Sequence, residues 1–75
     1  MSGTLPEYVA AQLRAEMGRQ ELTNQQLAQM LGVTDMWVSR RVRRQTQVTM
    51  ADLERIAAAL ECPLSYFLPA AERVA

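Results

Sequence analysis

The sequence contains no histidine, no lysine and a single cysteine among its 75 residues. Without histidine, the usual zinc-ligand sets and the Ser-His-Asp type of catalytic triad have no members. Cys62 has no partner for an internal disulfide, which excludes a disulfide-stapled secreted domain. No apolar run approaches the roughly 20 residues that span a bilayer, and the N-terminus lacks a signal-peptide pattern. We therefore expect a cytoplasmic protein with no membrane segment, no metal and no cofactor.

The length of the chain also limits its organisation. A chain of 75 residues has room for one domain and buries only about 60% of the surface that its unfolded form exposes. We expect a single domain over residues 1–75, with a core over about 5–68 and a C-terminal tail over 69–75. Asp52 and Glu54 fall on different helix faces and have no electrophilic or metal partner, so we expect no enzyme.

The charges are balanced overall but unevenly distributed along the chain. Eight arginines and eight acidic residues give a formal net charge of zero. Between Met36 and Ala51, however, there is no acidic residue. The basic residues of that segment are Arg40, Arg41, Arg43 and Arg44. Because counterion release depends on where the charges lie, a net charge of zero does not exclude a nucleic-acid partner.

The spacing of apolar residues predicts a first helix over about 7–17. The positions expected to face inward are Val9, Ala10, Leu13 and Met17. Gln12, Arg14 and Glu16 are expected on the opposite side. Pro6 suits the first turn of this helix, and Gly18 suits its end.

Three threonines mark the starts of further helices. Thr23, Thr34 and Thr49 each show the pattern of an N-cap with a hydrophobic staple. The apolar pairs that flank them are Leu22 with Leu27, Val33 with Val38, and Val48 with Leu53. Gln26 completes a capping box with Thr23. Each cap is worth about 1 kcal/mol, which makes short helices credible in a domain of this size.

These starts predict helices over about 24–31, 35–43 and 50–60, and a last short helix after Pro63. Gly32 lies in the three-residue connection between the first two of these, where a positive φ gives a tight turn. Two short helices joined in this way form a helix-turn-helix unit. The inward positions are expected to be Leu27, Ala28, Leu31, Val38, Val42, Leu53, Ile56, Ala57 and Leu60. With no strand pattern, the fold class is all-α, a compact bundle of about five short helices.

The helix expected over about 35–43 has more arginine and exposed apolar side chains than a core requires. A recognition helix in the DNA major groove contacts base edges with its N-terminal residues and its central outward face. On that geometry the base-contacting residues are Asp35, Met36, Ser39 and Arg40. Arg40 would donate to guanine, Asp35 would accept from cytosine or stabilise the helix N-terminus, and Met36 would contact a thymine methyl. The residues expected at phosphates or on the flanks are Asn24, Gln25, Thr34, Trp37, Arg41, Arg43 and Arg44.

Each of these residues also has an interpretation without DNA. An arginine run is more often a solvated surface, and Trp37 suits a core or rim position over the turn equally well. Met36 also suits the role of a flexible gap-filler. Asn24 and Gln25 either donate to a phosphate at a helix N-terminus or are simply solvated. Thr34 is mainly a helix cap.

A resemblance to a known family extends from Leu22 to Leu68, LTNQQLAQMLGVTDMWVSRRVRRQTQVTMADLERIAAALECPLSYFL. The pattern Leu-Ala, Leu-Gly-Val, Val-Ser-Arg and Ile-Ala-x-x-Leu resembles the phage repressor and Cro-type (xenobiotic-response-element) helix-turn-helix family. The runs WVSRR and DLERIAAAL are also similar to regulators, including immunity repressors, of phages that infect actinobacteria. The resemblance implies a bundle of about five helices that binds operator DNA and blocks or recruits polymerase. It places Asn24 and Gln25 at the family's phosphate position, and Asp35, Met36, Ser39 and Arg40 at its base-contacting positions.

Two segments depart from the family's pattern. Members usually have an apolar residue where Arg41 stands, and Glu-x-Gly where Val42, Arg43 and Arg44 stand. We therefore expect the recognition helix to run longer or to end differently. The usual glycine after the fourth helix is replaced by Glu61 and Cys62, so that turn is also expected to differ.

The leading hypothesis is a sequence-specific regulator of double-stranded DNA, a phage-type repressor or a Cro-like protein, that neutralises about 4 to 6 phosphates. The alternatives are a recombination directionality factor or a protein-interaction module, antitoxin-like or adaptor, anchored by Met36 and Trp37. A homodimer would place two recognition helices on a palindrome. The apolar residues left for such a contact are Tyr66, Phe67, Leu68 and Val74, which suit a core equally well.

Overall fold

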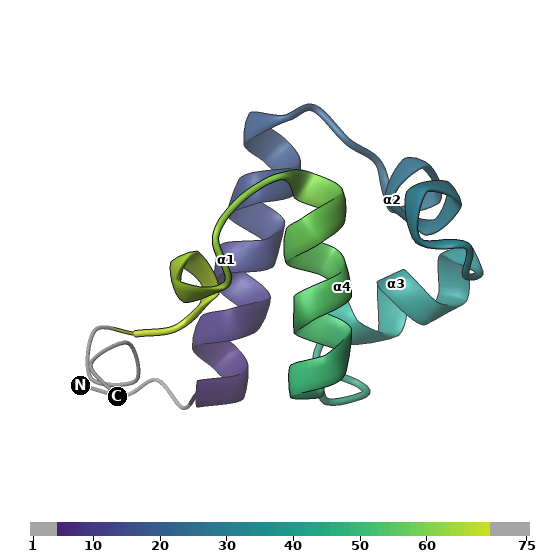
Figure 1. Ribbon diagram of the computed structural model, residues 1–75. Coiled ribbons are helices and arrows are strands. Elements are labelled where there is room, and N and C mark those ends of the chain that lie inside the picture. The colour runs from purple at the N-terminus through teal and green to yellow at the C-terminus, as the bar shows by residue number, and fades with distance from the viewer. Residues whose placement is uncertain (1–4, 70–75) are drawn as a thin grey trace.

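The computed structural model describes residues 5–69, which form four α-helices and one 3₁₀ helix (Figure 1). The elements are α1 (Leu5–Arg19), α2 (Asn24–Leu31), α3 (Asp35–Val42), α4 (Met50–Leu60) and η1 (Leu64–Phe67). The all-α class expected from the sequence is confirmed, and α2 and α4 have the predicted bounds. In the described part of the chain, no helix has the length and apolar character needed to cross a membrane.

Three threonine caps start the helices where the sequence predicts. The Thr23 hydroxyl accepts from the Gln26 N–H at 3.1 Å, and the Gln26 side chain accepts from the Thr23 N–H at 2.8 Å, which completes a capping box. Thr34 accepts from Trp37 N–H at 3.1 Å at the start of α3. Thr49 forms a second capping box, with Asp52, that the sequence analysis did not identify.

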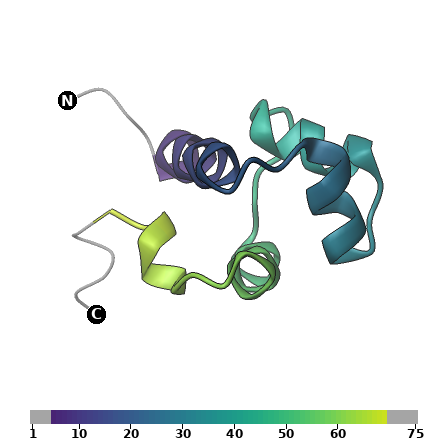
Figure 2. The same ribbon diagram turned by 90° about the horizontal axis from the view of Figure 1, so that it is seen from above.

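Helices α1 and α4 are joined through the other elements. Element η1 packs against both of them, α3 packs against α1, and α2 packs against α3 and α4. Figures 1 and 2 show η1 on one side of α1 and α4, and α2 with α3 on the other. The core lies between them and contains apolar residues of every element. Its members are Val9, Leu13, Met17, Leu27, Ala28, Val38, Leu53, Ile56, Ala57, Leu60 and Phe67. The helix-turn-helix unit of α2 and α3 therefore projects from a scaffold that α1, α4 and η1 provide.

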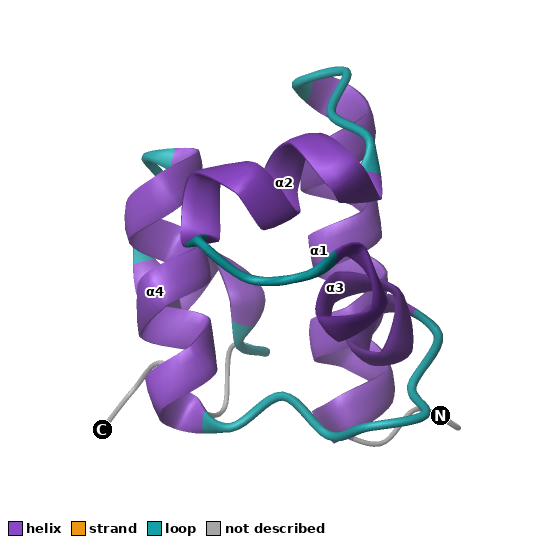
Figure 3. Cartoon of the chain, turned by 90° about the vertical axis from the view of Figure 1, so that its right-hand side faces the viewer, coloured by secondary structure: helices purple, strands orange, loops and turns teal. Residues whose placement is uncertain are grey.

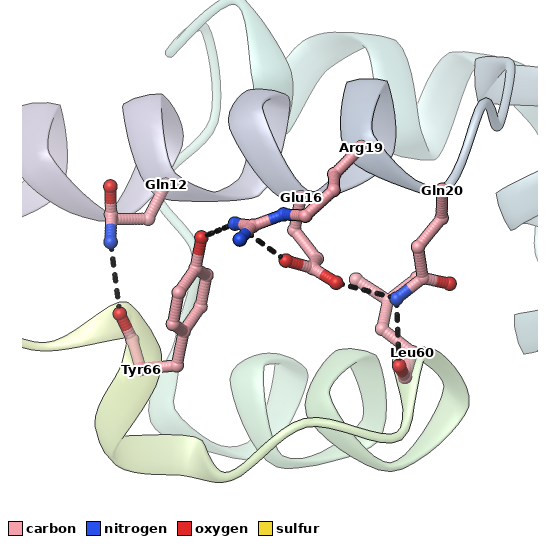
Figure 4. Close-up of polar contacts among 6 residues, drawn as sticks. All are labelled: Gln12, Glu16, Arg19, Gln20, Leu60 and Tyr66. Carbon is pink, nitrogen blue, oxygen red and sulfur yellow. Dashed lines mark hydrogen bonds and ion pairs between the residues drawn. The ribbon is translucent and has the colours of Figure 1, made fainter.

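Two expectations for α1 are wrong. Glu16 is 8% exposed and faces inward, where Arg19 and Gln20 satisfy its carboxylate at 2.9 and 2.6 Å (Figure 4). The cause is its position at the α1–η1–α4 junction, because Arg19 also donates to the Tyr66 hydroxyl and Gln20 donates to the Leu60 carbonyl. Gly18 does not end the helix, which continues to Arg19.

Left-handed backbone conformations occur at four turns of the described chain. Gly32 ends α2 with a φ of 72°, as predicted, and its N–H bonds back to the last turn of the helix. Glu61 adopts the same conformation at the end of α4, with a φ of 58°, where the family usually has glycine. Glu21 after α1 and Arg44 after α3 also have positive φ values, 58° and 66°. Non-glycine residues pay a steric cost in this region, which the packing of the flanking helices must offset.

The C-terminal apolar residues belong to the core of the same chain. Phe67 is fully buried, and Tyr66 and Leu68 are half-buried against the core cluster. Gln12 fixes this segment by donating to the Tyr66 carbonyl at 3.1 Å (Figure 4). Of the two uses considered for this segment, the structure therefore favours the core for Phe67, which offers no surface to a second chain. Val74 lies outside the described residues.

Candidate nucleic-acid interface

Helix α3 runs from the outer edge of the molecule back toward α1 and α4 (Figure 1). Its inward side buries Val38 completely, and Val42 packs partly against the core. Asp35 is exposed in the first turn of the helix, Arg40 is exposed on the side opposite Val38, and Met36 is 57% exposed. Ser39 is half-buried between these positions. The helix therefore presents an outward surface, which we call the α3 face, made of Asp35, Met36, Ser39 and Arg40.

The first turn of α3 is open to solvent at the side of the molecule seen in Figure 3. Asp35 lies in this turn, where its charge is favourable to the positive end of the helix dipole. Asn24 and Gln25 begin α2 and are half-buried and exposed respectively. Thr34 is exposed, but its hydroxyl is used for the α3 cap. The starts of α2 and α3 therefore both lie on the outer part of the helix-turn-helix unit, away from η1 (Figure 1).

The arginines expected at phosphates differ in what surrounds them. Arg43 is exposed, as is Arg40, and within residues 5–69 neither side chain has an ion-pair partner. The Arg44 guanidinium lies 2.8 Å from the carboxylate of Glu7, with both side chains about half exposed. Arg41, in contrast, has a side chain that is only 14% exposed. The four residues are therefore not one uniform basic patch.

Arg41 is held between α3 and α4. Its Nε donates to the Asp52 carboxylate at 3.2 Å, and its Nη1 donates to the Trp37 carbonyl at 3.1 Å. Its guanidinium carbon lies 3.7 Å from the centre of the Trp37 ring, well within cation–π distance. Arg55 of α4 lies near the same ring, at 5.9 Å. We call Arg41, Trp37 and Asp52 the α3–α4 clamp.

Asp52 has two tasks at the start of α4. Its carboxylate accepts from the Thr49 N–H at 3.2 Å, in the capping box, and it pairs with Arg41. Burial by itself raises the pKa of Asp52, but the hydrogen bonds of Thr49 and the guanidinium of Arg41 outweigh burial and hold the pKa below its ordinary value. The carboxylate is therefore ionised at neutral pH. The Thr49 cap was predicted, and the spacing Thr-x-x-Asp was the sequence signal that could have identified the reciprocal bond to Asp52 as well.

Two further arginines fix the ends of α2 and α3. Arg55 donates to the Leu31 carbonyl at 2.8 Å, and Arg14 donates to the Val42 carbonyl at 2.8 Å. Both carbonyls lie in the last turn of a helix, where they have no partner within the helix. These residues are 24 and 28 positions apart in the sequence, so no local pattern predicts the bonds. They attach the helix-turn-helix unit to α4 and α1.

The structure does not favour an exposed tryptophan anchor. Trp37 is half-buried and packs against the core cluster, with Arg41 across its ring. Of the two interpretations of this residue, the core or rim position therefore agrees with the packing. Among the residues that the structure describes, no group of three or more metal-ligating side chains comes together. Cys62 is half-buried, and its pKa is raised by burial and by the nearby Glu16.

Comparison with known proteins shows the family and the fold. A family profile described as helix-turn-helix matches residues 13–67. The structure is similar to a hypothetical transcription factor, NHTF, from Neisseria, with a TM-score of 0.82 and 25% identity over 95% of this chain and 83% of that one. It is also similar in fold to the clp gene regulator ClgR from C. glutamicum, with a TM-score of 0.81 and 24% identity over 99% of this chain and 97% of that one. A search of curated proteins finds no match.

Proposed function

We infer that this chain, which belongs to the Cro/C1-type helix-turn-helix family, is a DNA-binding transcriptional regulator that recognises a specific double-stranded operator. We propose that α3 enters the major groove and that Asp35, Met36, Ser39 and Arg40 contact base edges. Regulation then results from occupying the operator, as in a phage-type repressor or a Cro-like protein. No chemical step is required, and we expect the protein to act in the cytoplasm.

The observation that carries this proposal is the division of α3 into two sides. Val38 is completely buried on one side, whereas Met36 is more than half exposed on the other and Arg40 is exposed beside it. An exposed methionine next to an arginine offers an apolar contact for a thymine methyl and a two-donor fork for guanine. Both groups are on a helix whose last carbonyl accepts from Arg14 of α1 and whose Arg41 pairs with Asp52 of α4.

We propose separate roles for the remaining polar residues. Arg43 and Arg44 follow α3 and are exposed, which suits contacts with phosphates. Asn24 and Gln25 begin α2, where N–H groups at the helix start also favour a phosphate. Thr34 and Trp37 position α3 through the cap and the core, and the paired guanidinium of Arg41 has the same task.

Selection from a randomised duplex library tests the function directly. We expect an enriched operator, and titration of that duplex should change the fluorescence of Trp37, the single tryptophan. An enriched palindrome would indicate a dimer, and an asymmetric site would indicate one chain per site. If no sequence is enriched and binding is weak and salt-sensitive for all duplexes, the proposed function is wrong and a protein partner at Met36 becomes the next hypothesis.

A further inference from the structure

We propose that Arg41 is a positioning residue for sequence recognition, which acts by clamping α3 to α4 and not by contacting DNA. The inference rests on the proposed function and names a determinant of its specificity. It starts from the arginine of α3 whose side chain is only 14% exposed, whereas Arg40 beside it is exposed. A guanidinium here requires a partner, and the structure provides one on another helix.

The clamp connects α3 to α4, against which α3 otherwise packs little. Helix α3 packs chiefly against α2 and α1. Figure 3 shows α3 and α4 on opposite sides of the view, joined below by the loop over residues 43–49. Arg41 and Asp52 bridge this interval with a charged hydrogen bond of 3.2 Å, between side chains that are 14% and 15% exposed. A partly buried pair of this kind is directional, so it fixes the orientation of α3 as well as its position.

Three contacts fix the position of the Arg41 guanidinium. Nε is bound to Asp52, Nη1 is bound to the Trp37 carbonyl, and the plane of the group lies over the Trp37 ring. Asp52 is itself held by the Thr49 cap, so its carboxylate belongs to the rigid start of α4. The base-contacting residues Met36 and Arg40 are neighbours of Trp37 and Arg41 in the sequence. A small rotation of α3 would therefore move both of them away from the base edges.

The alternative for Arg41 is a direct phosphate contact. A hollow beside the loop over residues 43–49 is lined by both Arg41 and Arg44, together with Pro6, Thr46, Gln47 and Val48. A DNA strand that reached this hollow would attract both guanidinium groups. The two roles predict opposite effects for the loss of Asp52. A clamp would be weakened, whereas a phosphate-contacting arginine would be released.

The test compares the affinities of Arg41→Leu, Arg41→Lys and Asp52→Asn for the selected duplex and for a scrambled duplex over a range of salt. We expect each variant to lose about tenfold in affinity for the selected duplex, and less than about twofold for the scrambled one, with an unchanged salt slope. Arg41→Lys keeps the charge but not the planar fork, so it should still lose selectivity. The double variant Arg41→Leu/Asp52→Asn should be no worse than either single variant.

Two control variants separate the clamp from other causes. Arg43→Ala removes an exposed arginine and should weaken both duplexes equally, with a salt slope smaller by about 1. Thr23→Ala removes a cap of α2 and should lower stability without changing selectivity. The proposal is overturned if Arg41→Leu behaves like Arg43→Ala, if Asp52→Asn tightens binding, or if Thr23→Ala loses as much selectivity as Arg41→Leu.

A measurement without DNA tests the α3–α4 clamp separately from the proposed function. We expect Arg41→Leu and Asp52→Asn to shift the Trp37 emission of the folded protein in the same direction, because each opens the clamp over the ring. Unchanged emission in both variants would overturn the clamp even if an operator had been found. A shift in emission without an enriched operator would instead leave the clamp intact and reject the proposed function.

Discussion

At the scale of single residues, some arginines bond to other groups of the chain, whereas others have no such partner among the described residues. Arg14, Arg41 and Arg55 donate to helix carbonyls or to Asp52 of the same chain. Arg40 and Arg43 are exposed and have no ion-pair partner within residues 5–69. Composition alone does not distinguish these groups, because the distinction depends on which carbonyl or carboxylate each side chain reaches.

Arg40 is the residue that we expect to affect base preference most. Arg40→Ala should reduce affinity for the selected duplex by about 1 to 3 kcal/mol and relax the preference at one base pair, since a two-donor contact to guanine is lost. Binding to duplexes with each base pair at that position measures this effect. An equal loss on all duplexes would make Arg40 a phosphate contact.

We expect Glu7 to oppose DNA binding, because it pairs with Arg44. The two groups are 2.8 Å apart and about half exposed, so a phosphate must compete with this carboxylate. We expect Glu7→Gln to raise affinity for specific and scrambled duplexes about two- to fivefold at low salt, in the range of an exposed ion pair. Titrations at two salt concentrations measure the change. Glu54→Gln removes the same charge from an exposed position of α4, and an equal gain in that control would contradict a role for the pair.

At the scale of elements, α2, α3 and α4 begin in the same way but end in different ways. The three predicted threonine caps are present, and they explain how helices of eight residues begin at defined positions. The C-terminal ends are less regular. Arg43 ends α3 without glycine, and Glu61 ends α4 in a left-handed conformation.

The end of α4 gives a prediction on stability. Glu61→Gly should raise the free energy of unfolding by about 1 kcal/mol, because glycine adopts a φ of 58° without the steric cost of a Cβ. Gly32→Ala should lower it by about 1 kcal/mol for the converse reason, although no atom lies within 4 Å of the added Cβ. Urea unfolding followed by Trp37 fluorescence measures both. Ala58→Gly, within the helix, is the control and should destabilise.

At the scale of the whole molecule, the described residues form a scaffold of α1, α4 and η1 and a projecting unit of α2 and α3 (Figure 1). Polar side chains hold the scaffold together and connect it to the projecting unit. Glu16, Arg19 and Gln20 join α1 to η1 and α4 on one side, and Arg14 and Arg55 join the scaffold to the unit on the other. We therefore expect polar junctions to contribute to the global stability.

Asp52 makes that stability depend on pH. Its folded-state pKa is below that of the unfolded chain, so the ionised carboxylate stabilises the fold at neutral pH. This contribution is present above the unfolded pKa, near pH 4, and is lost as the pH falls through the folded value. Unfolding free energies at about pH 7 and about pH 2.5 should differ more for the wild type than for Asp52→Asn. Equal pH dependence in the two proteins would contradict the assignment.

The class of the fold, the starts of α2, α3 and α4 and the turn at Gly32 could all be predicted from the sequence. These features depend on neighbours within about four residues, such as Thr23 with Gln26, and such short-range physics can be seen in a linear pattern. The sequence also indicated which residues of α3 are candidates for DNA contact. Val38 has the spacing of an inward position, whereas Met36 lies on the outward side with Arg40. The base contacts themselves stay a prediction.

The polar residues that face inward could not be predicted from local patterns. Glu16 has the spacing of a surface position, yet it is buried because Arg19 and Gln20 satisfy it at a junction of three elements. Arg41 belongs to a basic run, yet it is paired with a carboxylate 11 positions away. Ion pairs and hydrogen bonds between distant segments depend on where the packed helices place both partners. That placement is a property of the assembled core, which no local pattern contains.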